Sequence, residues 1–470
     1  MSRKILVKKM EEAIPIKREK VAALKKNHGS LELETIKLDH ILNGGRGLTT
    51  LLWEGSSLDP NEGIRFRSRT LPEILKTLPN PRAESMFWYL LTGEVPTKDE
   101  AVGFSKDLAK ISGLGREVEN VMDSLPRATH PMTQLQIGVA LLANQSAFSP
   151  LYASETPLAK SEYWRSTLDD SLALVAKLPS LAARIYRNTY FPNRELAHSG
   201  KQAGDLIHSY ASTMKYMISS DKDAPCRSVT FEEYLGLYIA LHSDHEGGNV
   251  SAHATQLVGS ALVNPFTAYS AGVAGLSGPL HGLANQNVLK FILQMQAKLS
   301  ANPTEQDESD EQAPPKQITD EDVKTYLWDY LKSGRVIPGY GHAVLRSTDP
   351  RFTALQDFTQ RHAKEFENSE VVRLVKVLAE ITPGVLKEHG KTKNPNPNVD
   401  ATSGCLLHHY GLTQIDYYTV IFGISRAIGT SAQLVWDRAL GLPIERPKSI
   451  TLDGLERLAR AKLEGGADGQ

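Results

Sequence analysis

The residues from 336 to 351, VIPGYGHAVLRSTDPR, combine side chains that could do chemistry with a backbone that cannot form a regular element. Proline and glycine surround His342, so the chain can turn sharply there and approach a ligand closely. Arg346 and Arg351 follow, and their planar guanidinium groups suit recognition of a carboxylate or a phosphate. A neutral imidazole between fixed cations can donate a hydrogen bond to an oxygen that becomes negative during a reaction. The stretch predicts a site for an anionic substrate; the alternative is a polar surface loop.

Imidazole and carboxylate groups also gather in HSDHEGGNVSAH, residues 242–253, at the end of a predicted helix. The side chains that suggest a metal site are His242, Asp244, His245, Glu246 and His253. Their spacing lacks the H-E-x-x-H pattern that places two imidazoles on one helix face. We therefore expect no metal here, and predict that one histidine meets an anionic ligand at the helix terminus.

A further histidine, His281, lies in SGPLHGLANQ, where proline and glycine precede a helical pattern. The field at a helix N-terminus disfavours a charged imidazole and would keep this ring a neutral hydrogen-bond donor. The alternative for a lone histidine is a purely structural role.

The segment EHGKTKNPNPNVDATSG carries Lys391, Lys393 and Asp400 on a loop that two prolines stiffen. An aspartate held on such a loop could act as a general base. A helix N-cap is the alternative for this aspartate.

Two arginines occur near the C-terminus, Arg426 in the apolar FGISRAIG and Arg446 in IERPKS. An arginine buried in an apolar helix needs an anionic partner, because an unpaired buried charge is strongly unfavourable. A ligand carboxylate is such a partner, whereas a lone arginine can otherwise extend to solvent.

The elements that must position these groups are mostly helices. The first thirty residues predict a charged helix ending near residues 27–29, followed by a short β-like stretch. Residues 51–70 predict small strands and turns, and from about residue 71 the apolar spacing is helical. The polar region 191–228 is interpreted as a surface excursion, and the acidic, proline-bearing insert 300–320 as a disordered surface loop. The fold class is mainly α.

Composition excludes several classes of function. The 470 residues carry a net charge of -1, so no basic field recruits nucleic acid or an anionic membrane, and no apolar run is long enough for a membrane span. Two cysteines exclude a disulfide framework and indicate a reducing intracellular compartment. The basic start, MSRKILVKKM, fits a trimmed mitochondrial presequence or the first turn of a helix, which the acidic residues 11 and 12 favour. Localisation is predicted as cytoplasmic, or as the mitochondrial matrix if a presequence has been removed.

Taken together, these motifs resemble the citrate synthase family of the eukaryotic type, over residues from about 12 to 455. WEGSSLDPNEGIRFRSRT and HPMTQL near the front resemble the family too. The resemblance implies an almost all-α homodimer whose two domains close over the substrates. The large domain would comprise 1–282 and 412–470, and the small domain 283–411. Residues 191–228 and 300–320 depart from the family pattern.

The resemblance also implies the reaction. His281 would polarise the acyl-CoA carbonyl while Asp400 removes the α-proton, and His342 would donate to the keto oxygen of oxaloacetate as the carbon–carbon bond forms. Water would then hydrolyse the thioester. The carboxylates of oxaloacetate would be held by His245, Arg351, Arg426 and Arg446, the last from the neighbouring subunit. The CoA phosphates would be held by Arg46, Arg187 (again from the neighbour), Arg346, Lys391 and Lys393. No cofactor besides the CoA thioester substrate is implied.

The acyl group is left open by the sequence. Citrate synthase is the preferred interpretation, with a 2-methylcitrate or longer-chain alkylcitrate synthase as the alternative, since one methylene changes binding by only about 1–3 kcal/mol. Thr430 and Ser431, after Arg426, could widen a nearby pocket. A non-catalytic protein on the same fold is a distant alternative, against which the intact His281, His342 and Asp400 argue.

Overall fold

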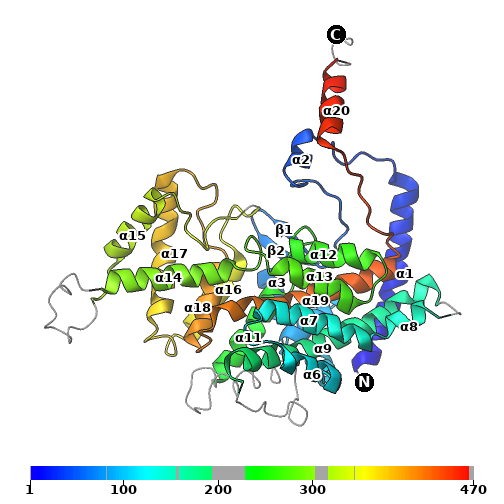
Figure 1. The fold of residues 1–470 in the computed structure, drawn as a ribbon, viewed down its shortest axis with the longest axis horizontal. Coiled ribbons are helices and arrows are strands. Elements are labelled where there is room, and N and C mark those ends of the chain that lie inside the picture. The colour runs from blue at the N-terminus through cyan, green and yellow to red at the C-terminus, as the bar shows by residue number, and fades with distance from the viewer. Residues whose placement is uncertain are drawn as a thin grey trace.

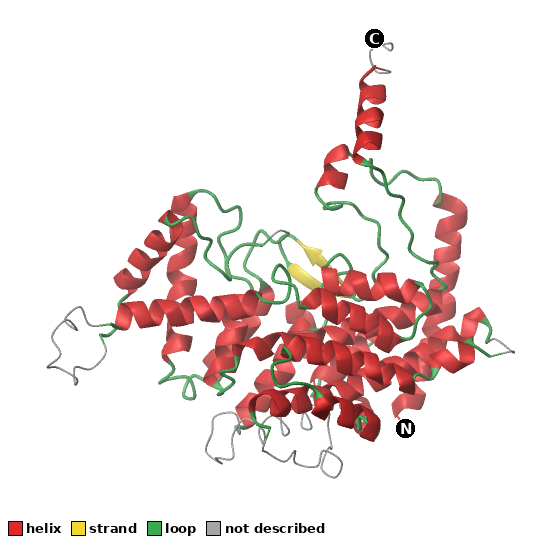
Figure 2. Ribbon diagram, in the orientation of Figure 1, coloured by secondary structure: helices red, strands yellow, loops and turns green. Residues whose placement is uncertain are grey.

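The computed structural model describes residues 2–80, 82–154, 158–192, 228–301, 316–342 and 344–464. The chain is mostly helical, which confirms the predicted fold class (Figures 1 and 2). Most of the predicted surface excursion at 191–228 and of the acidic insert at 300–320 lies outside the described residues. None of the described helices is both long enough and apolar enough to cross a lipid bilayer.

The first helix, α1 (Ser2–His28), ends where the sequence predicted. It buries Leu6, Met10 and Ile14, one residue per turn, so only its first half has a face in the core. The β-like stretch predicted after it is wrong. Residues 31–36 form no strand, and the short helix α2 (Leu38–Leu42) follows.

The small strands expected within residues 51–70 are confirmed. They are β1 (Ser56–Asp59), β2 (Gly63–Phe66) and β3 (Arg69–Thr70), paired antiparallel in the order β1-β2-β3. Ser56 pairs with Phe66 and Asp59 with Gly63 across the first hairpin. The buried face of β2 rests on the helical body, so the sheet is a small cover on one side of it (Figure 2).

Helices of the main body surround the long pair α9 (Tyr163–Tyr190) and α19 (Tyr418–Leu440), which pack against each other along the core. Proline at the first turn of α7 (Pro131–Leu142) and of α13 (Pro265–Leu276) marks helix starts that the sequence encodes locally, and so does a capping box at Thr97 before α5 (Lys98–Ala109). The other helices of the body are α3 (Leu71–Thr77), α4 (Arg82–Thr92), α5 (Lys98–Ala109), α6 (Arg116–Ser124), α7 (Pro131–Leu142), α8 (Phe148–Tyr152), α11 (Val229–His242), α12 (Val250–Ser260) and α13 (Pro265–Leu276). Short 3-10 turns lie at Ala143–Gln145, Lys160–Glu162 and Ile415–Tyr417.

A second group of helices packs together at one end of the molecule, on the left in Figure 1. It comprises α14 (Ala284–Ser300), α15 (Asp320–Lys332), α16 (Pro350–Arg361), α17 (Glu370–His389) and α18 (Asp400–His409). The predicted domain boundaries, with 283–411 as the small domain, stay a prediction.

Two segments project from the body on the same side, at the top of Figure 1. One contains α2, and the other runs from α19 to α20 (Leu452–Glu464). Large apolar side chains on these segments are exposed to solvent: Leu31, Leu33, Ile36, Leu38, Ile41, Leu42, Ile444, Ile450, Leu452, Leu458 and Leu463. Within one chain these side chains have no core to enter.

Candidate active site

Two irregular segments lie side by side between the two groups of helices: 336–342 with 344–346, and 391–399. An antiparallel bridge between Tyr340 and Pro397 joins them. Gly339 makes this pairing possible, because its φ is +83° and a Cβ there would lie 2.9–3.1 Å from atoms of α14 and α18. The sharp turn predicted for this stretch is confirmed, and the backbone here packs closely on α14 and α18; its close approach to a ligand stays a prediction.

Asparagine side chains hold these segments in place of helical or sheet hydrogen bonds. Asn394 donates to the carbonyls of Leu345 (2.8 Å) and Ser347 (3.2 Å), and Asn398 donates to the carbonyl of Gly341 (3.1 Å). Asn394 is buried, so its amide group needs acceptors within the protein, and these two carbonyl groups provide them. Residues 336–351 and 391–400 are called the loop wall below.

His342 on the loop wall has a defined proton position. Its Nδ1 accepts hydrogen bonds from the backbone N–H groups of Val344 (3.0 Å) and Leu345 (3.1 Å). Burial lowers the pKa of His342, and the nearby charge of Arg351 lowers it further. The ring is therefore neutral, with its proton on Nε2, and can donate from that atom.

Asp400 is the first residue of α18, and the N-cap position belongs to Val399, so the alternative of an N-cap aspartate is wrong. Burial raises the pKa of Asp400 to about 6, against the opposing charge of Arg351 and with reinforcement from Asp349. A carboxylate whose pKa lies near neutrality is ionised at physiological pH and is a stronger base than an ordinary aspartate.

Arg351, near the start of α16, is buried and paired with Asp349, which is also buried. The guanidinium Nη2 lies 2.7 Å from the carboxylate, whose Oδ2 also accepts from the N–H of Val399 (3.2 Å). Burial alone would raise the pKa of Asp349, but the charge and hydrogen bonds of Arg351 prevail and hold it below its usual value. Asp349 thus ties the start of α16 to the residue before Asp400.

Facing the loop wall is a second wall built from helices, called the helix wall below: the N-terminus of α12, the turn before α14, and α19. Arg426 of α19 is buried there, and its Nη1 donates to Asn249 Oδ1 (2.7 Å) and Ser251 Oγ (3.2 Å). Its Nε has no hydrogen-bond partner among the described residues. Burial lowers the pKa of Arg426 to about 10, so it remains a cation at neutral pH.

His281 faces α12 from the turn before α14. Its Nε2 accepts from the backbone N–H of Ser251 (3.3 Å) and lies 2.9 Å from Ser251 Oγ. Because a backbone N–H can only donate, the proton of the neutral ring is on Nδ1. Burial lowers the pKa of His281 to about 4, with Arg426 as the second cause. A neutral ring is what the sequence predicts. Burial is the first cause of its lowered pKa, and the helix N-terminus that the ring meets is that of α12, through the N–H of Ser251, rather than that of the following helix α14.

His245 lies where the two walls meet. Its ring centroid is 5.8 Å from that of His342. Burial holds the pKa of His245 well below its usual value, and the charges of Arg351 and Arg426 add to this effect. Its Nε2 is buried and, like Nε of Arg426, has no hydrogen-bond partner within the described chain.

His242 and Asp244, from the same stretch, have structural contacts. His242 stacks on Tyr238 with centroids 4.2 Å apart and bonds the carbonyl of the same residue. Asp244 accepts from Trp53 Nε1 and Ser56 Oγ, both at 2.8 Å, which anchors the strand β1 beside the site. In the described ranges no group of three or more histidine, cysteine, aspartate or glutamate side chains is placed to bind a metal ion.

The residues expected near CoA divide into two groups. The first group is exposed on the loop wall and lies near His342 and Asp400 in the sequence: Arg346, Lys391 and Lys393. Arg46 is exposed on the projecting segment of α2, and Arg187 of α9 forms an ion pair with Asp123 (2.9 Å). The structure does not bring this second pair to the site of the same chain.

Arg446, expected to bind oxaloacetate, is also exposed and away from the site of its own chain. The residue before it, Glu445, is fixed to α12: its carboxylate lies 2.6 Å from His253 Nε2 and its N–H donates to Ser260 Oγ (3.0 Å). The chain therefore leaves the body in a defined direction at Arg446.

Three residues of the site were missed by sequence reasoning: Asn249, Ser251 and Asp349. Asp349 carried a readable signal, since an aspartate directly before proline is typical of a helix N-cap, and its side chain does accept from the N–H of Arg351 (2.9 Å). Asn249 likewise caps α12. Nothing in the local sequence pairs Ser251 with a histidine thirty residues later.

The effect of Thr430 and Ser431 on a nearby pocket stays a prediction. Both are buried in α19, and the Thr430 hydroxyl donates to the carbonyl of Arg426 (3.0 Å) in its own helix. The residue before them, Gly429, allows close packing. A Cβ at Gly429 would lie 2.6 Å from Asp244, so glycine lets α19 approach the segment that carries His245.

Comparison with known proteins decides the family. The family model "Citrate synthase, C-terminal domain" matches residues 44–448. The chain belongs to the citrate synthase family. It is 49% identical to the 2-methylcitrate synthase, mitochondrial, of Emericella nidulans, covering 95% of this chain and 93% of that protein. It is 46% identical to Citrate synthase 3, mitochondrial, of Saccharomyces cerevisiae, covering 96% and 92%.

Solved structures agree on the fold. The citrate synthase of Pyrobaculum aerophilum superposes with a TM-score of 0.73 at 22% identity, over 90% of this chain and 96% of that one. The citrate synthase of Thermoplasma acidophilum, in a ternary complex with carboxymethyl coenzyme A and oxaloacetate, gives a TM-score of 0.68 at 19% identity, over 89% of this chain and 97% of that one. The family match and the close relatives identify the chain as an enzyme of the transferase type that condenses an acyl-CoA with oxaloacetate.

Proposed function

We propose that the two walls form the active site of this condensation and that propionyl-CoA is accepted as well as acetyl-CoA. The observation that carries the site is a pair of buried nitrogen atoms, Arg426 Nε and His245 Nε2, which have no hydrogen-bond partner among the described residues and lie beside the cation Arg351. Buried polar groups are almost always hydrogen-bonded, so two that are not indicate where a ligand binds, and with His245 in its Nε2–H tautomer both would donate to an anion. A dicarboxylate such as oxaloacetate satisfies both.

Enolisation of the acyl-CoA comes first. The Asp400 carboxylate takes a proton from the α-carbon, and the electron pair moves toward the thioester oxygen. The Nδ1–H of His281 donates to that oxygen, because its Nε2 already accepts from Ser251. A base and a donor on opposite walls stabilise the enolate together, which neither would do alone.

Condensation follows when the enol carbon attacks the keto carbon of oxaloacetate. The carbonyl oxygen becomes an alkoxide and receives a hydrogen bond, then a proton, from Nε2 of His342. Arg351, Arg426 and His245 hold the carboxylates in the orientation that exposes the keto carbon. Water finally hydrolyses the thioester, releasing CoA and a citrate or 2-alkylcitrate. Arg346, Lys391 and Lys393 provide the basic rim for the CoA phosphates.

The acyl preference rests on the relatives. The 2-methylcitrate synthases of Emericella nidulans and Aspergillus fumigatus are 49% and 48% identical to this chain, and the citrate synthase of Neurospora crassa is 46% identical. We infer that propionyl-CoA is a substrate, giving 2-methylcitrate, and that acetyl-CoA is the second. The test is CoA release by the purified protein with oxaloacetate and each acyl-CoA, compared by kcat/KM. Propionyl-CoA turned over at less than a hundredth of the acetyl-CoA rate would overturn the inference.

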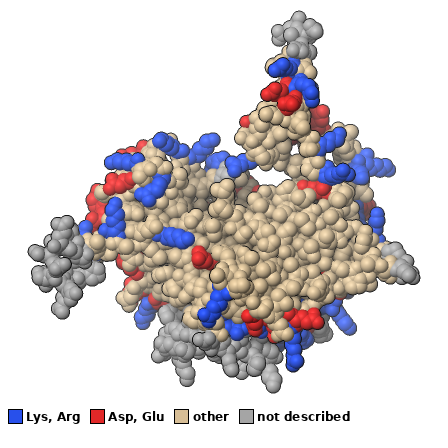
Figure 3. All heavy atoms as spheres, in the orientation of Figure 1, with Lys and Arg blue, Asp and Glu red and all other residues tan. Residues whose placement is uncertain are grey.

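A homodimer is proposed from the surface. The helices α7, α12 and α13 contain no lysine, arginine, aspartate or glutamate, and the face that they form in Figure 3 is nearly free of charge. The projecting segments add exposed leucine and isoleucine side chains. A second copy would cover both surfaces and receive Arg446, and with it Arg46 and Arg187, at its own site.

Light scattering tests the dimer. Ala274→Asp places a charge on the exposed side of α13 and is expected to give monomers with little activity, because each site would lose its partner's Arg446. A dimeric and fully active variant would contradict this proposal.

The proposed compartment is the mitochondrial matrix, because the relatives are named mitochondrial. Fractionation of cells that make the protein tests this proposal.

A further inference from the structure

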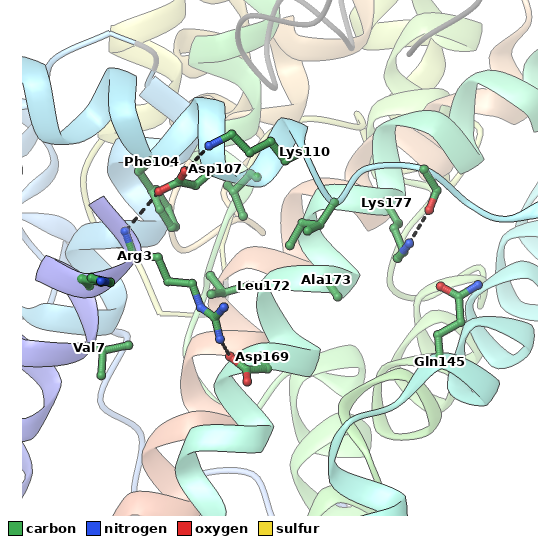
Figure 4. Close-up of a pocket in the computed structure, with 14 residues that line it drawn as sticks. Arg3, Val7, Phe104, Asp107, Lys110, Gln145, Asp169, Leu172, Ala173 and Lys177 are labelled. Carbon is green, nitrogen blue, oxygen red and sulfur yellow. Dashed lines mark hydrogen bonds and ion pairs between the residues drawn. The ribbon is translucent and has the colours of Figure 1, made fainter. Parts of the chain in front are cut away.

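A second cavity, of about 980 Å³, lies between α1, α5 and α9, away from both walls of the active site (Figure 4). Its volume lies within the range of about 300–1,000 Å³ that small-molecule sites occupy. No residue assigned above to catalysis, to oxaloacetate or to CoA lines it.

The floor of this cavity is apolar. Phe104 and Leu108 of α5 and Leu172 of α9 are each no more than 3% exposed, and Val7, Ile111 and Ala173 add to the apolar surface. In Figure 4 the side chains of Leu172 and Ala173 lie between a charged group around Arg3 on one side and Lys177 on the other. An elongated apolar body would cover this floor and remove it from water.

The acidic groups at the cavity are already matched. The Asp169 carboxylate pairs with the Arg3 guanidinium. Asp107 accepts from the N–H of Arg3 (3.2 Å) and from Lys110 Nζ (2.9 Å). These contacts leave the carboxylates little capacity to attract a cationic ligand.

The basic groups are in excess. Arg3, Lys4, Lys110 and Lys177 line the cavity against two carboxylates. Lys177 is half-buried, and its amine donates to the carbonyl of Gly113, with no carboxylate in contact among the described residues. Burial lowers the pKa of Lys177, since its charge is partly desolvated without a counter-ion. A partly buried ammonium in this situation is stabilised by an anion.

We propose that this cavity binds a monocarboxylate with an unbranched apolar chain, of the fatty-acid class, with its carboxylate on Lys177 and its chain over Leu172 and Ala173. The ligand chemistry follows from the apolar floor and the uncompensated charge. The site is independent of the condensation and takes no part in it.

Isothermal titration of the full chain with decanoate, below its micellar concentration, tests the proposal. We expect Lys177→Met to weaken decanoate binding at least tenfold, and Lys177→Arg to restore it, because arginine keeps the charge. The neutral probe 1-decanol should bind wild type and Lys177→Met equally. Lys106→Met is the matched control, because Lys106 is exposed on α5 outside the cavity and its loss should leave binding unchanged.

A second variant tests the location rather than the charge. Ala173→Trp fills the cavity and should abolish binding of both decanoate and decanol, while CoA release remains at the wild-type rate. Decanoate binding should also persist when the active site is saturated with oxaloacetate and CoA. No decanoate binding by the wild type, equal binding by Lys177→Met, unchanged binding by Ala173→Trp, or displacement by the active-site ligands would each overturn the proposal.

Discussion

The two walls of the active site are built in different ways. On the helix wall, Arg426 and Ser251 belong to regular helices and are buried in the body of the molecule. On the loop wall, His342 and Asp400 follow irregular backbone that side chains such as Asn394 hold in place. The helix wall inherits its rigidity from packing, whereas the loop wall depends on a few polar contacts. Substitutions should separate the two: loop-wall changes should reduce catalysis with little loss of stability.

The sharpest test of the loop wall is Asp400→Asn, which removes the proposed base. We expect kcat to fall about 1,000-fold, within the range attributed to general bases. Stability should rise, because a folded pKa of about 6 means that the ionised carboxyl destabilises the fold above that pH. The gain at pH 8 should be about 1–3 kcal/mol in the free energy of unfolding, reduced by partial exposure. CoA-release kinetics and thermal melting measure both; near-wild-type activity would exclude Asp400 as the base.

On the helix wall, Arg426→Met should lower kcat/KM for oxaloacetate about 100-fold, because a buried cation that pairs with a substrate carboxylate contributes several kcal/mol. The KM for acyl-CoA should change far less. Arg165→Met, which removes an exposed arginine paired with Glu11 and Glu162, is the control and should have no effect. Equal losses for the two substrates would mean that Arg426 supports the fold rather than binding oxaloacetate.

The helices and the loops of the site also differ in how well the sequence predicts them. The helices carry their own signals in apolar spacing, and the helical structure predicted from about residue 71 onward is confirmed; caps such as Thr97 and the prolines that begin α7 and α13 are further local signals. The reactive residues could be recognised because glycine and proline lie beside them in the sequence. These two residues interrupt helices and strands, so their presence next to a reactive side chain indicates a functional loop. The residues recognised in this way are His281, His342 and Asp400. The strand predicted after α1 was wrong because apolar and polar side chains alternate at the start of residues 31–36, as they would in a strand. In the structure of the single chain these apolar side chains are exposed to solvent, and the sequence pattern cannot distinguish such a segment from a strand.

Contacts between residues far apart in the sequence could not be predicted. Arg426 was expected to be buried, but its neighbours Asn249 and Ser251 lie about 175 positions away and no local pattern pairs them with it. The cause of the His281 pKa shift was missed for the same reason, since burial is a property of the assembled helices. Reactive residues can be recognised locally, whereas the groups that set their protonation come from distant parts of the chain.

The pH dependence of the wild type follows from the loop wall. Asp400 must be ionised to accept a proton, and its pKa of about 6 lies above the ordinary value of 3.8. We therefore expect kcat/KM for acyl-CoA to be constant from pH 7 to 8 and to fall about tenfold per unit below pH 6. Initial rates between pH 5 and 8 measure the profile. An acid limb near pH 4 would mean that the site does not desolvate this carboxyl.

Asp349→Asn tests whether one contact can hold the loop wall. The amide keeps an acceptor for the N–H of Arg351 but loses the ion pair that fixes the guanidinium. We expect kcat/KM to fall roughly 10- to 30-fold, corresponding to about 1.5–2 kcal/mol. Because Asp349 also raises the pKa of Asp400, the acid limb should move to lower pH. A loss of activity with an unmoved limb would limit Asp349 to positioning Arg351.

The smallest effect is expected from Ser251→Ala on the helix wall. The hydroxyl lies 2.9 Å from Nε2 of His281, but the N–H of the same residue remains to fix the tautomer. We expect kcat to fall about three- to tenfold, as for one hydrogen bond, with the pH profile unchanged. Ser112→Ala is the control, because Ser112 lies beyond α5 and its hydroxyl donates to the carbonyl of Ala109, the last residue of that helix. A loss above 100-fold would mean that the hydroxyl itself holds the ring, and that the helix wall depends on single polar contacts as much as the loop wall does.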